Sequence, residues 1–402
     1  MYKNLRIKQI ALLFIAIFAF ESCKKDLTPV NSTLQAASLS NANATLTAKG
    51  GQTVTIMGKN LLSSGQTPTI TLNTKHLNIA YSSNDSIKVI IPKLVGSGKI
   101  TITEGDKTYA GPQFTYQYTA TVTTVAGTGK AGNNDGAGDI ATFNCPWGIT
   151  ADLNGDLYIA DVYNRLIRKI AAATGQVSSV SFGGLDFDSP YNIALDTKKH
   201  DLYVTDFNIH LAKIAADGSM SVIYTGAATT TGIAFGPDGF LYMSNNNLGT
   251  ILKLTPDGQT ATNFSSGIGT PRNIIFNSNN TMFVAGYNAA TASAGIFQVD
   301  NTGAATFVLP DKSFGGWEIA ADTYGNFYEA DHFNNVIRLI DPNGNAITIA
   351  GTGAAADVDG MGLGASFNGP QGLTIDANGT LYVTTYNYDT KGGNKVRKIV
   401  VD

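Results

Sequence analysis

The stretch Gly148-Ile-Thr-Ala-Asp-Leu-Asn-Gly-Asp-Leu-Tyr-Ile-Ala-Asp161 decides the fold of most of the chain. Two short apolar segments flank a turn of Asp, Asn and Gly, which is the pattern of a tight β-hairpin. Variants of this hairpin recur up to the end of the chain, and an aromatic residue in the second segment marks each of them. These aromatic residues are Tyr158, Tyr203, Tyr242, Phe283, Tyr328 and Tyr382.

Two further segments complete most of the repeating units. A third apolar segment, such as Leu166 to Ile170, follows the aromatic residue, and a Gly-containing turn leads to a fourth, such as Asn345 to Ala350. Units of roughly 40 to 50 residues with four strands each predict propeller blades, because one such sheet cannot bury both of its faces alone. The last unit stops after three strands, so we expect Thr121–Val125 to complete it and leave no open edge.

The repeats resemble NHL repeats, most clearly in Phe143 to Ile170, Trp317 to Ile340 and Phe367 to Ile399. Units two to four are more divergent. The resemblance implies a six-bladed NHL-type β-propeller over residues 118–402, closed by an N-terminal strand. The composition agrees with an all-β chain, since Gly is abundant with 44 residues and only 14% of residues are charged.

A smaller domain is expected over residues 44–117. Short alternating segments such as Thr53 to Met57 and Lys99 to Thr103 are bounded by Gly, Pro or Asn-Asp turns, which predicts a small sandwich. The run from Gly50 to Leu61, with Gly98 to Ile102 later, resembles an IPT/TIG domain. The resemblance implies an immunoglobulin-like fold that acts as a spacer or packing module.

The start of the chain predicts export. A basic segment precedes an apolar run from Ile10 to Phe20, which is too short to span a bilayer and fits the core of a signal peptide. The following Glu21-Ser-Cys23-Lys-Lys resembles a lipobox of the Bacteroidota type. We therefore expect a signal peptide over 1–22, lipidation of Cys23 and a tether over 23–43, in an outer-membrane lipoprotein that faces the cell surface or the periplasm. The alternative is a plain secretory signal with an incidental Cys.

Charge and motifs argue for binding rather than catalysis. The net charge is −3, with neither a nucleic-acid footprint nor a polybasic membrane patch, so membrane contact is expected through the lipid anchor only. Peptide-amidating lyases of the NHL group need a histidine-ligated metal, but only His210 and His332 are expected near the channel. Glu318, Asn192 and Asn273 partly resemble the metal set of gluconolactonase-like propellers. A metal-dependent, lactonase-like enzyme therefore stays open as an alternative.

The alignment of the units nominates a ligand-binding surface. The loops that enter each innermost strand and the loops after each second strand open on one face around the channel, and aromatic and polar side chains there suit a glycan or a similarly polar ligand. The expected ligand-binding residues are Trp147, Tyr191, Arg272, Trp317, Gln371, Asn192, Asn273, Glu318, Asp161, Asp206, Asp331 and His332. Their expected neighbours are Tyr163, Asn164, Asn208, His210, Asn246, Tyr287 and Tyr386. The alternative is structural: the Asp residues cap blade corners, and the Trp residues pack between blades.

No metal or cofactor is expected, but calcium stays open at two long loops, 129–143 and 353–367. These loops carry Asp135, Asp139, Asp357 and Asp359. The leading function is a lipid-anchored cell-envelope binding protein that takes a carbohydrate or other polar ligand, and an envelope protein–protein scaffold is the alternative. A concave polar cleft would favour a glycan, whereas a broad flat apolar patch would favour a protein partner.

Overall fold

The computed structural model describes residues 38–62, 65–181, 189–206, 210–226, 230–310, 316 and 318–402. The expected signal peptide, the lipidation site Cys23 and most of the expected tether lie outside the described residues, as do Trp317 and Asn208. Within the described part of the chain, no helix has the length and apolar character needed to cross a membrane.

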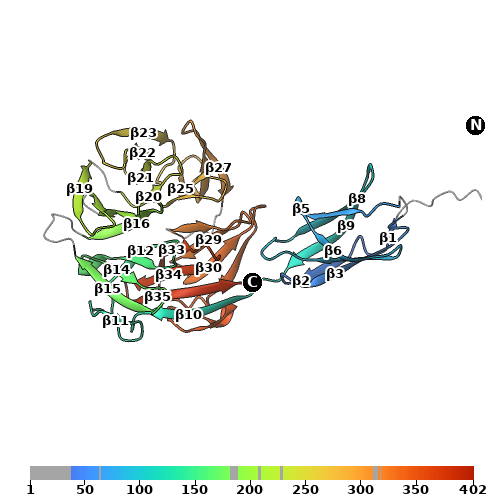
Figure 1. The fold of residues 1–402 in the computed structure, drawn as a ribbon, viewed down its shortest axis with the longest axis horizontal. Helices are drawn as coiled ribbons and strands as arrows, with labels where there is room; N and C mark the ends of the chain where they lie inside the picture. Colours follow the sequence, from blue (N-terminus) through green and yellow to red (C-terminus); the bar gives the residue numbers. More distant parts are fainter. Residues whose placement is uncertain are drawn as a thin grey trace, which may run out of the picture.

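The small domain is a sandwich of two sheets (Figure 1). One sheet has the strand order β1 (Ser38–Leu39), β3 (Thr53–Lys59), β7 (Ser86–Ile90) and β6 (Asn78–Ser82). The other has the order β2 (Thr45–Ala48), β9 (Lys107–Tyr116), β8 (Gly98–Glu104), β4 (Thr69–Leu72) and β5 (Lys75–His76). Alternate residues of these strands, such as Ile56, Val89 and Phe114, fill a single core. β1, which lies within the expected tether, pairs with β3 through Ser38 and Leu39 and so forms part of this sheet.

From residue 120 onward the described residues form six antiparallel sheets. The first sheet consists of β11 (Gly136–Ala137), β12 (Pro146–Ala151), β13 (Leu157–Asp161), β14 (Leu166–Ile170) and β15 (Gln176–Ser181). The second consists of β16 (Pro190–Asp196), β17 (Asp201–Asp206), β18 (His210–Ile214) and β19 (Met220–Thr225). The third consists of β20 (Ile233–Phe235), β21 (Leu241–Asn245), β22 (Thr250–Leu254) and β23 (Ala261–Ser266).

The next two sheets are β24 (Ile274–Phe276), β25 (Met282–Asn288), β26 (Ser293–Val299) and β27 (Ala305–Pro310); and β28 (Ile319–Ala321), β29 (Phe327–Asp331), β30 (Val336–Ile340) and β31 (Ala346–Ala350). The last consists of β33 (Pro370–Ile375), β34 (Leu381–Asn387), β35 (Gly392–Val401), β10 (Ala120–Ala126) and β32 (Gly360–Met361). We number these six sheets as blades 1 to 6 in this order.

The blades close into a ring. The innermost strands contact one another in the succession β12, β16, β20, β24, β28 and β33, and β33 contacts β12 again. This arrangement is a β-propeller, so the fold expected from the sequence is confirmed.

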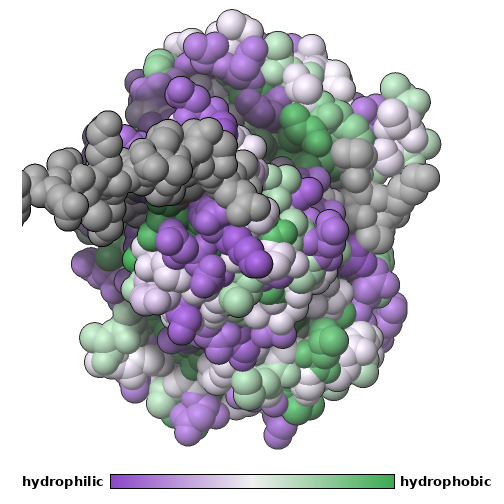
Figure 2. All heavy atoms as spheres, turned by 90° about the vertical axis from the view of Figure 1, so that its right-hand side faces the viewer, coloured by the Kyte–Doolittle hydropathy of each residue, from purple (hydrophilic) through white to green (hydrophobic). Residues whose placement is uncertain are grey.

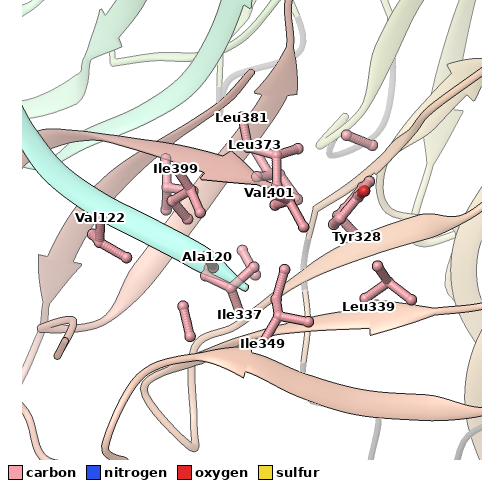
Figure 3. Close-up of a cluster of buried hydrophobic side chains, with 14 of the residues drawn as sticks. Ala120, Val122, Tyr328, Ile337, Leu339, Ile349, Leu373, Leu381, Ile399 and Val401 are labelled. Atoms are coloured by element: carbon pink, nitrogen blue, oxygen red, sulfur yellow. The ribbon is translucent and has the colours of Figure 1, made fainter. Parts of the chain in front are cut away.

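The N-terminal strand closes the ring as expected. β10 pairs antiparallel with β35, from Ala120 opposite Val401 to Ala126 opposite Val396. Figure 3 shows β10 crossing a buried cluster in which Ala120 and Val122 lie among side chains of blades 5 and 6. Because this strand satisfies the outer edge of β35, residues far apart in the chain hold the first and last blades together.

The two ends of the blades differ, and we call them the upper and the lower face. Connections from the second to the third strand of a blade, and from one blade to the next, lie on the upper face. Hairpins between the first and second strands, and between the third and fourth, lie on the lower face. In the first lower-face hairpin, Asp152 Oδ1 accepts hydrogen bonds from the N–H groups of Asn154 and Asp156, each at 2.9 Å, so this Asp-rich segment is a turn.

The small domain contacts the lower face of blades 5 and 6. The Asn326 amide, fully buried in a hairpin of blade 5, donates to the Leu94 carbonyl at 3.0 Å. Leu94 is part of the buried cluster of these blades, and Lys93 pairs with Asp402 at 2.8 Å. Figure 2 views the molecule from the small-domain end, where purple hydrophilic residues mix with scattered green ones outside the grey atoms. Because the small domain contacts the lower face, the upper face is directed away from it.

Candidate functional site

Three polar side chains meet at the centre of the ring. Glu318 Oε1 accepts a hydrogen bond from the Asn192 amide at 2.7 Å, and Oε2 accepts one from the Asn273 amide. Burial raises the pKa of Glu318 well above its usual value, and the Asn192 hydrogen bond opposes part of that rise. The carboxyl group and the two amides therefore form a plug across the channel.

Neighbouring innermost strands approach so closely that three blades carry Gly at this level. A Cβ on Gly232 would lie 1.8 Å from the Arg272 carbonyl oxygen, and one on Gly372 would lie 2.1 Å from that of Trp147. Blades 2, 4 and 5 instead carry Asn192, Asn273 and Glu318. The central space is therefore shared by three side chains and not six, which is why these three reach one another.

The amide oxygens of the plug are bonded to the main chain and not to Glu318. Asn192 Oδ1 accepts from the N–H of Ile193 at 2.8 Å, and Asn273 Oδ1 accepts from the N–H of Ile319 at 3.2 Å. Both amides point their nitrogen atoms at Glu318, so their oxygens face away from it. Within the described part of the chain, no three His, Cys, Asp or Glu side chains are grouped as a metal site.

The three strand-ending carboxylates, Asp161, Asp206 and Asp331, hold blade corners together. Asp161 accepts from the N–H of Asn144 at 2.7 Å and pairs with Arg168 at 2.9 Å. Asp331 pairs with Arg338 at 2.9 Å, and Asp206 bonds the main chain and the ring of His210. All three are fully buried. Their burial and their bonds fit the structural alternative, in which these carboxylates cap blade corners.

The acidic residues of the two long loops mostly bind arginines. Arg168 also pairs with Asp135 at 2.8 Å, and Arg397 pairs with Asp357 at 3.0 Å and Asp359 at 2.8 Å. Both guanidinium groups are fully buried. These three carboxylates therefore pair with cations of the chain itself.

Aromatic side chains form a continuous cluster on the upper face. The Trp147 ring lies 4.6 Å from that of Tyr191 and 5.8 Å from that of Tyr388, measured between centroids. Tyr388 also contacts Tyr386 at 5.1 Å and His332 at 6.2 Å. Two further rings extend the cluster, Tyr163 against Tyr386 at 5.8 Å and Phe333 against His332 at 5.4 Å. We call these seven rings the aromatic cluster; they join blades 1, 2, 5 and 6.

The outer members of the aromatic cluster are exposed, whereas its inner members are buried. Phe333 is 66% exposed, Tyr163 51% and Tyr388 37%, while Trp147 and Tyr191 are only 3% and 2% exposed. Trp147 and Tyr191 therefore support the surface from below and do not form it, contrary to expectation. The exposed rings sit in connections between second and third strands, which position them around the mouth of the ring.

Polar groups accompany these rings. Gln371 is fully buried and donates from its amide to His332 Nδ1 and to the Tyr386 carbonyl, both at 2.9 Å. Gln371 Oε1 is buried with no hydrogen-bond partner among the described residues. Arg272 is half-buried and donates to the Gly316 carbonyl. Burial lowers the pKa of His332, so its imidazole is neutral at neutral pH.

The structure thus brings together Trp147, Tyr191, Gln371 and His332 from the expected set. It places Asn192, Asn273 and Glu318 beneath them in the plug. Sequence reasoning missed Phe333 and Tyr388. Their signal was present in the alignment, because Phe333 stands two residues after Asp331 just as Tyr163 stands two residues after Asp161.

Comparisons with known proteins agree with this domain organisation. A model of the IPT/TIG domain matches residues 37–116, and a model of the NHL repeat matches residues 143–170. Among curated proteins, the chain is similar to SUPPRESSOR OF QUENCHING 1, a chloroplastic protein of Arabidopsis thaliana, with 25% identity over 284 residues. The similar region covers 65% of this chain but only 26% of that relative.

Solved structures share the fold over most of the chain. A structural genomics protein of unknown function from Bacteroides thetaiotaomicron has a TM-score of 0.59 at 19% identity, covering 89% of this chain and 96% of its own. An auxiliary nutrient binding protein from the same species gives 0.54 at 20% identity, covering 88% and 95%. One from Bacteroides ovatus gives 0.51 at 18% identity, covering 92% and 99%. At these identities the likeness shows the fold.

Proposed function

We propose that this chain is a cell-envelope binding protein, anchored by a lipid on Cys23, whose upper face binds a carbohydrate. The observation that carries the proposal is the aromatic cluster, which exposes Tyr163, Phe333 and Tyr388 around one mouth. Aromatic rings offer large, rigid apolar area to the apolar faces of sugar rings, and a few polar groups among them fix hydroxyl groups. Arg272 and His332, which are half-buried, supply such polar groups, and Gln371 holds His332 in place from below.

The buried layer beneath the exposed rings supports this function. The buried Trp147 ring packs against Tyr388 and is itself backed by Tyr191, and Gln371 fixes the His332 ring through its hydrogen bond. A binding surface whose rings are already held in place loses little conformational entropy when a ligand arrives.

The arrangement of the domains fits presentation at a membrane. The small domain docks on the lower face, and the polypeptide enters that domain at β1, far from the propeller in Figure 1. An anchor at Cys23 would therefore leave the upper face pointing away from the lipid. The similarity in fold to auxiliary nutrient binding proteins of Bacteroides agrees with a binding role in the envelope.

A glycan array probed with the wild-type protein and with the variants Phe333→Ala and Tyr388→Ala tests the proposal. Each variant should weaken saccharide binding about tenfold or more, since one lost ring contact of about 1.4 kcal/mol has that effect. Tyr81→Ala is the matched control, because Tyr81 is a 53% exposed tyrosine of the small domain. If both cluster variants bind every glycan as the wild type does, the proposal is wrong. Loss of an envelope-protein partner without any saccharide binding would favour the scaffold function instead.

A further inference from the structure

The lower face of blades 2 to 4 is hollowed by three adjoining cavities of about 240, 380 and 400 Å³. The first is the open part of the central channel below the Glu318 plug, and the other two lie between neighbouring hairpins. Phe276 borders all three cavities, and Pro237 and Asn280 border two of them. The cavities therefore form one groove, which runs from the channel mouth outward between blades 3 and 4. Its two outer cavities fall within the range of roughly 300 to 1,000 Å³ in which small ligands bind.

Aromatic rings line this groove. The Tyr242 ring contacts those of Phe264 and Phe276 edge-on, at 5.1 and 5.4 Å between centroids. All three side chains border the cavity of about 400 Å³. Phe276 and Phe264 are half-buried, so part of each ring is left accessible within the groove.

A fixed pair of charges lies against these rings. Lys253 Nζ lies 2.7 Å from Asp238 Oδ2, which also accepts the hydroxyl of Tyr242 at 2.8 Å. The ammonium group lies 4.3 Å from the Phe240 ring centroid and 5.4 Å from that of Tyr242. The side chains of Lys253 and Asp238 are still 26% and 39% exposed. The pair thus presents a donor and an acceptor side by side, with no net charge.

Blade 4 carries an amide where the corresponding hairpins use Gly. Asn280 has a φ of 61°, in the left-handed region, whereas blades 3 and 6 have Gly239 and Gly379 at the same turn position. Asn is the side-chain-bearing residue that tolerates this conformation best. The Asn280 side chain is exposed beside Gln298 and Asn301, which also line the cavity of about 400 Å³.

We propose that this groove is a second saccharide site, on the face opposite the aromatic cluster. Adjacent hydroxyl groups of a sugar ring would accept from Lys253 and donate to Asp238, while its apolar face lies against Phe276. Asn280 and Gln298 supply further hydrogen bonds at the rim. The charged residues that border the two outer cavities balance, three lysines (Lys198, Lys199 and Lys253) against three aspartates (Asp196, Asp238 and Asp300). This balance favours an uncharged oligosaccharide over an anionic or cationic ligand, and the recess between hairpins favours a short chain over a flat protein surface.

Calorimetric titration of the whole protein with cellotriose, maltotriose and mannotriose tests this site. Lys253→Met and Asn280→Gly should each weaken binding of one trisaccharide about tenfold. Asn280→Gly installs the residue that blades 3 and 6 already use, so it removes the amide and retains the turn. Lys213→Met is the matched control, because Lys213 pairs with Asp201 at 2.7 Å in the same register of blade 2 but does not line the groove.

The same titrations separate this site from the upper face. Tyr388→Ala should leave binding in the groove unchanged, even if the upper face proves not to bind saccharide. Absence of binding for all three trisaccharides would overturn the inference, as would equal affinity in Lys253→Met, Asn280→Gly and Lys213→Met. Complete loss of binding in Tyr388→Ala would also overturn it, because all binding would then belong to the aromatic cluster.

Discussion

The two halves of the propeller ring are stabilised differently. In blades 1, 5 and 6 the residue of the third strand that pairs with the middle of the second is an arginine, namely Arg168, Arg338 or Arg397. In blades 2, 3 and 4 the same position holds Ala212, Leu252 or Phe297. We call blades 1, 5 and 6 the arginine half and blades 2, 3 and 4 the apolar half. The arginine half carries most of the upper-face aromatic cluster, whereas the apolar half carries the lower-face groove.

The difference shows how one repeat provides two kinds of surface. Arg168 pairs with Asp161 at a strand end and with Asp135 in a loop, whereas Arg397 pairs with two carboxylates of one loop, Asp357 and Asp359. These buried pairs fix the upper-face connections. Rings placed on those connections are then held rigidly. In the other half the same third-strand position is apolar and supplies no cation to the upper-face connections. The polar and aromatic groups with room for a ligand lie there at the hairpins of the lower face.

The largest expected effect comes from removing an arginine of the first half. Arg168→Met or Arg397→Met leaves one buried carboxylate, Asp161 or Asp357, without its cation, which typically costs about 3 to 5 kcal/mol. Thermal unfolding should show a large drop in Tm for both variants. Lys213→Met removes a partly exposed pair and should cost about 1 kcal/mol or less. Similar Tm values for the arginine and lysine variants would contradict the distinction between the halves.

A smaller effect is expected where the small domain rests on the arginine half. Asn326→Ala removes the hydrogen bonds to the Leu94 carbonyl and to Asp322, at 3.0 and 2.8 Å, in a fully buried position. A buried acceptor without its partner costs about 1 to 3 kcal/mol, which a urea titration resolves. Asn345→Ala, an exposed asparagine that bonds Asp341 in the other hairpin of blade 5, is the control. An Asn326→Ala variant as stable as this control would show that the contact does not matter.

The smallest expected effect is a dependence of stability on acid pH in blades 1 and 6. Burial alone would raise the pKa of Asp359, but the hydrogen bonds from Thr124 and Arg397 lower it below its usual value. The pKa of Asp135 is lowered in the same way by Ser179 and Arg168. A carboxyl group whose pKa is lower in the folded protein than in the unfolded protein stabilises the fold at pH values above its unfolded pKa. This stability is lost as the pH falls through the folded pKa, here below about pH 4.

Asp135→Asn and Asp359→Asn should therefore flatten the decline of Tm below pH 4. Asp139→Asn, an exposed position of the same loop as Asp135, should keep the wild-type slope. Parallel pH profiles for all three variants would show that these arginine pairs do not govern acid stability.

The fold was predictable because most of its signals are local. The turn residues and the aromatic of every unit fixed the hairpins, and the likeness of Thr121–Val125 to a fourth strand fixed the closure. The arginine pairs depend on contacts over longer separations, such as Asp135 with Arg168 and Asp359 with Arg397. Asp135 and Asp359 occupy matching positions in two loops of similar sequence, and this match could have predicted a shared partner. The composition of the loops alone gave no indication of that partner.

The candidate site was predicted in part. The alignment of the repeating units correctly placed Trp147 and Tyr191 near the mouth of the ring. An alignment does not tell whether a ring points outward or packs beneath its neighbours. Trp147 is buried because Tyr191 and Tyr388 cover it, and Tyr388 comes from the opposite end of the propeller sequence. The groove could not be predicted at all, since it arises from the spacing between hairpins of adjacent blades and not from a motif.

Hydrogen exchange of the backbone, followed by mass spectrometry with and without the saccharide selected on the glycan array, tests the central claim most directly. The amides of residues 162–165, 332–335 and 386–391 surround the exposed rings of the aromatic cluster. They should exchange more slowly in the presence of the ligand, because a bound sugar restricts the opening of these connections. Unchanged exchange in all three segments at saturating ligand would contradict a carbohydrate site on the upper face.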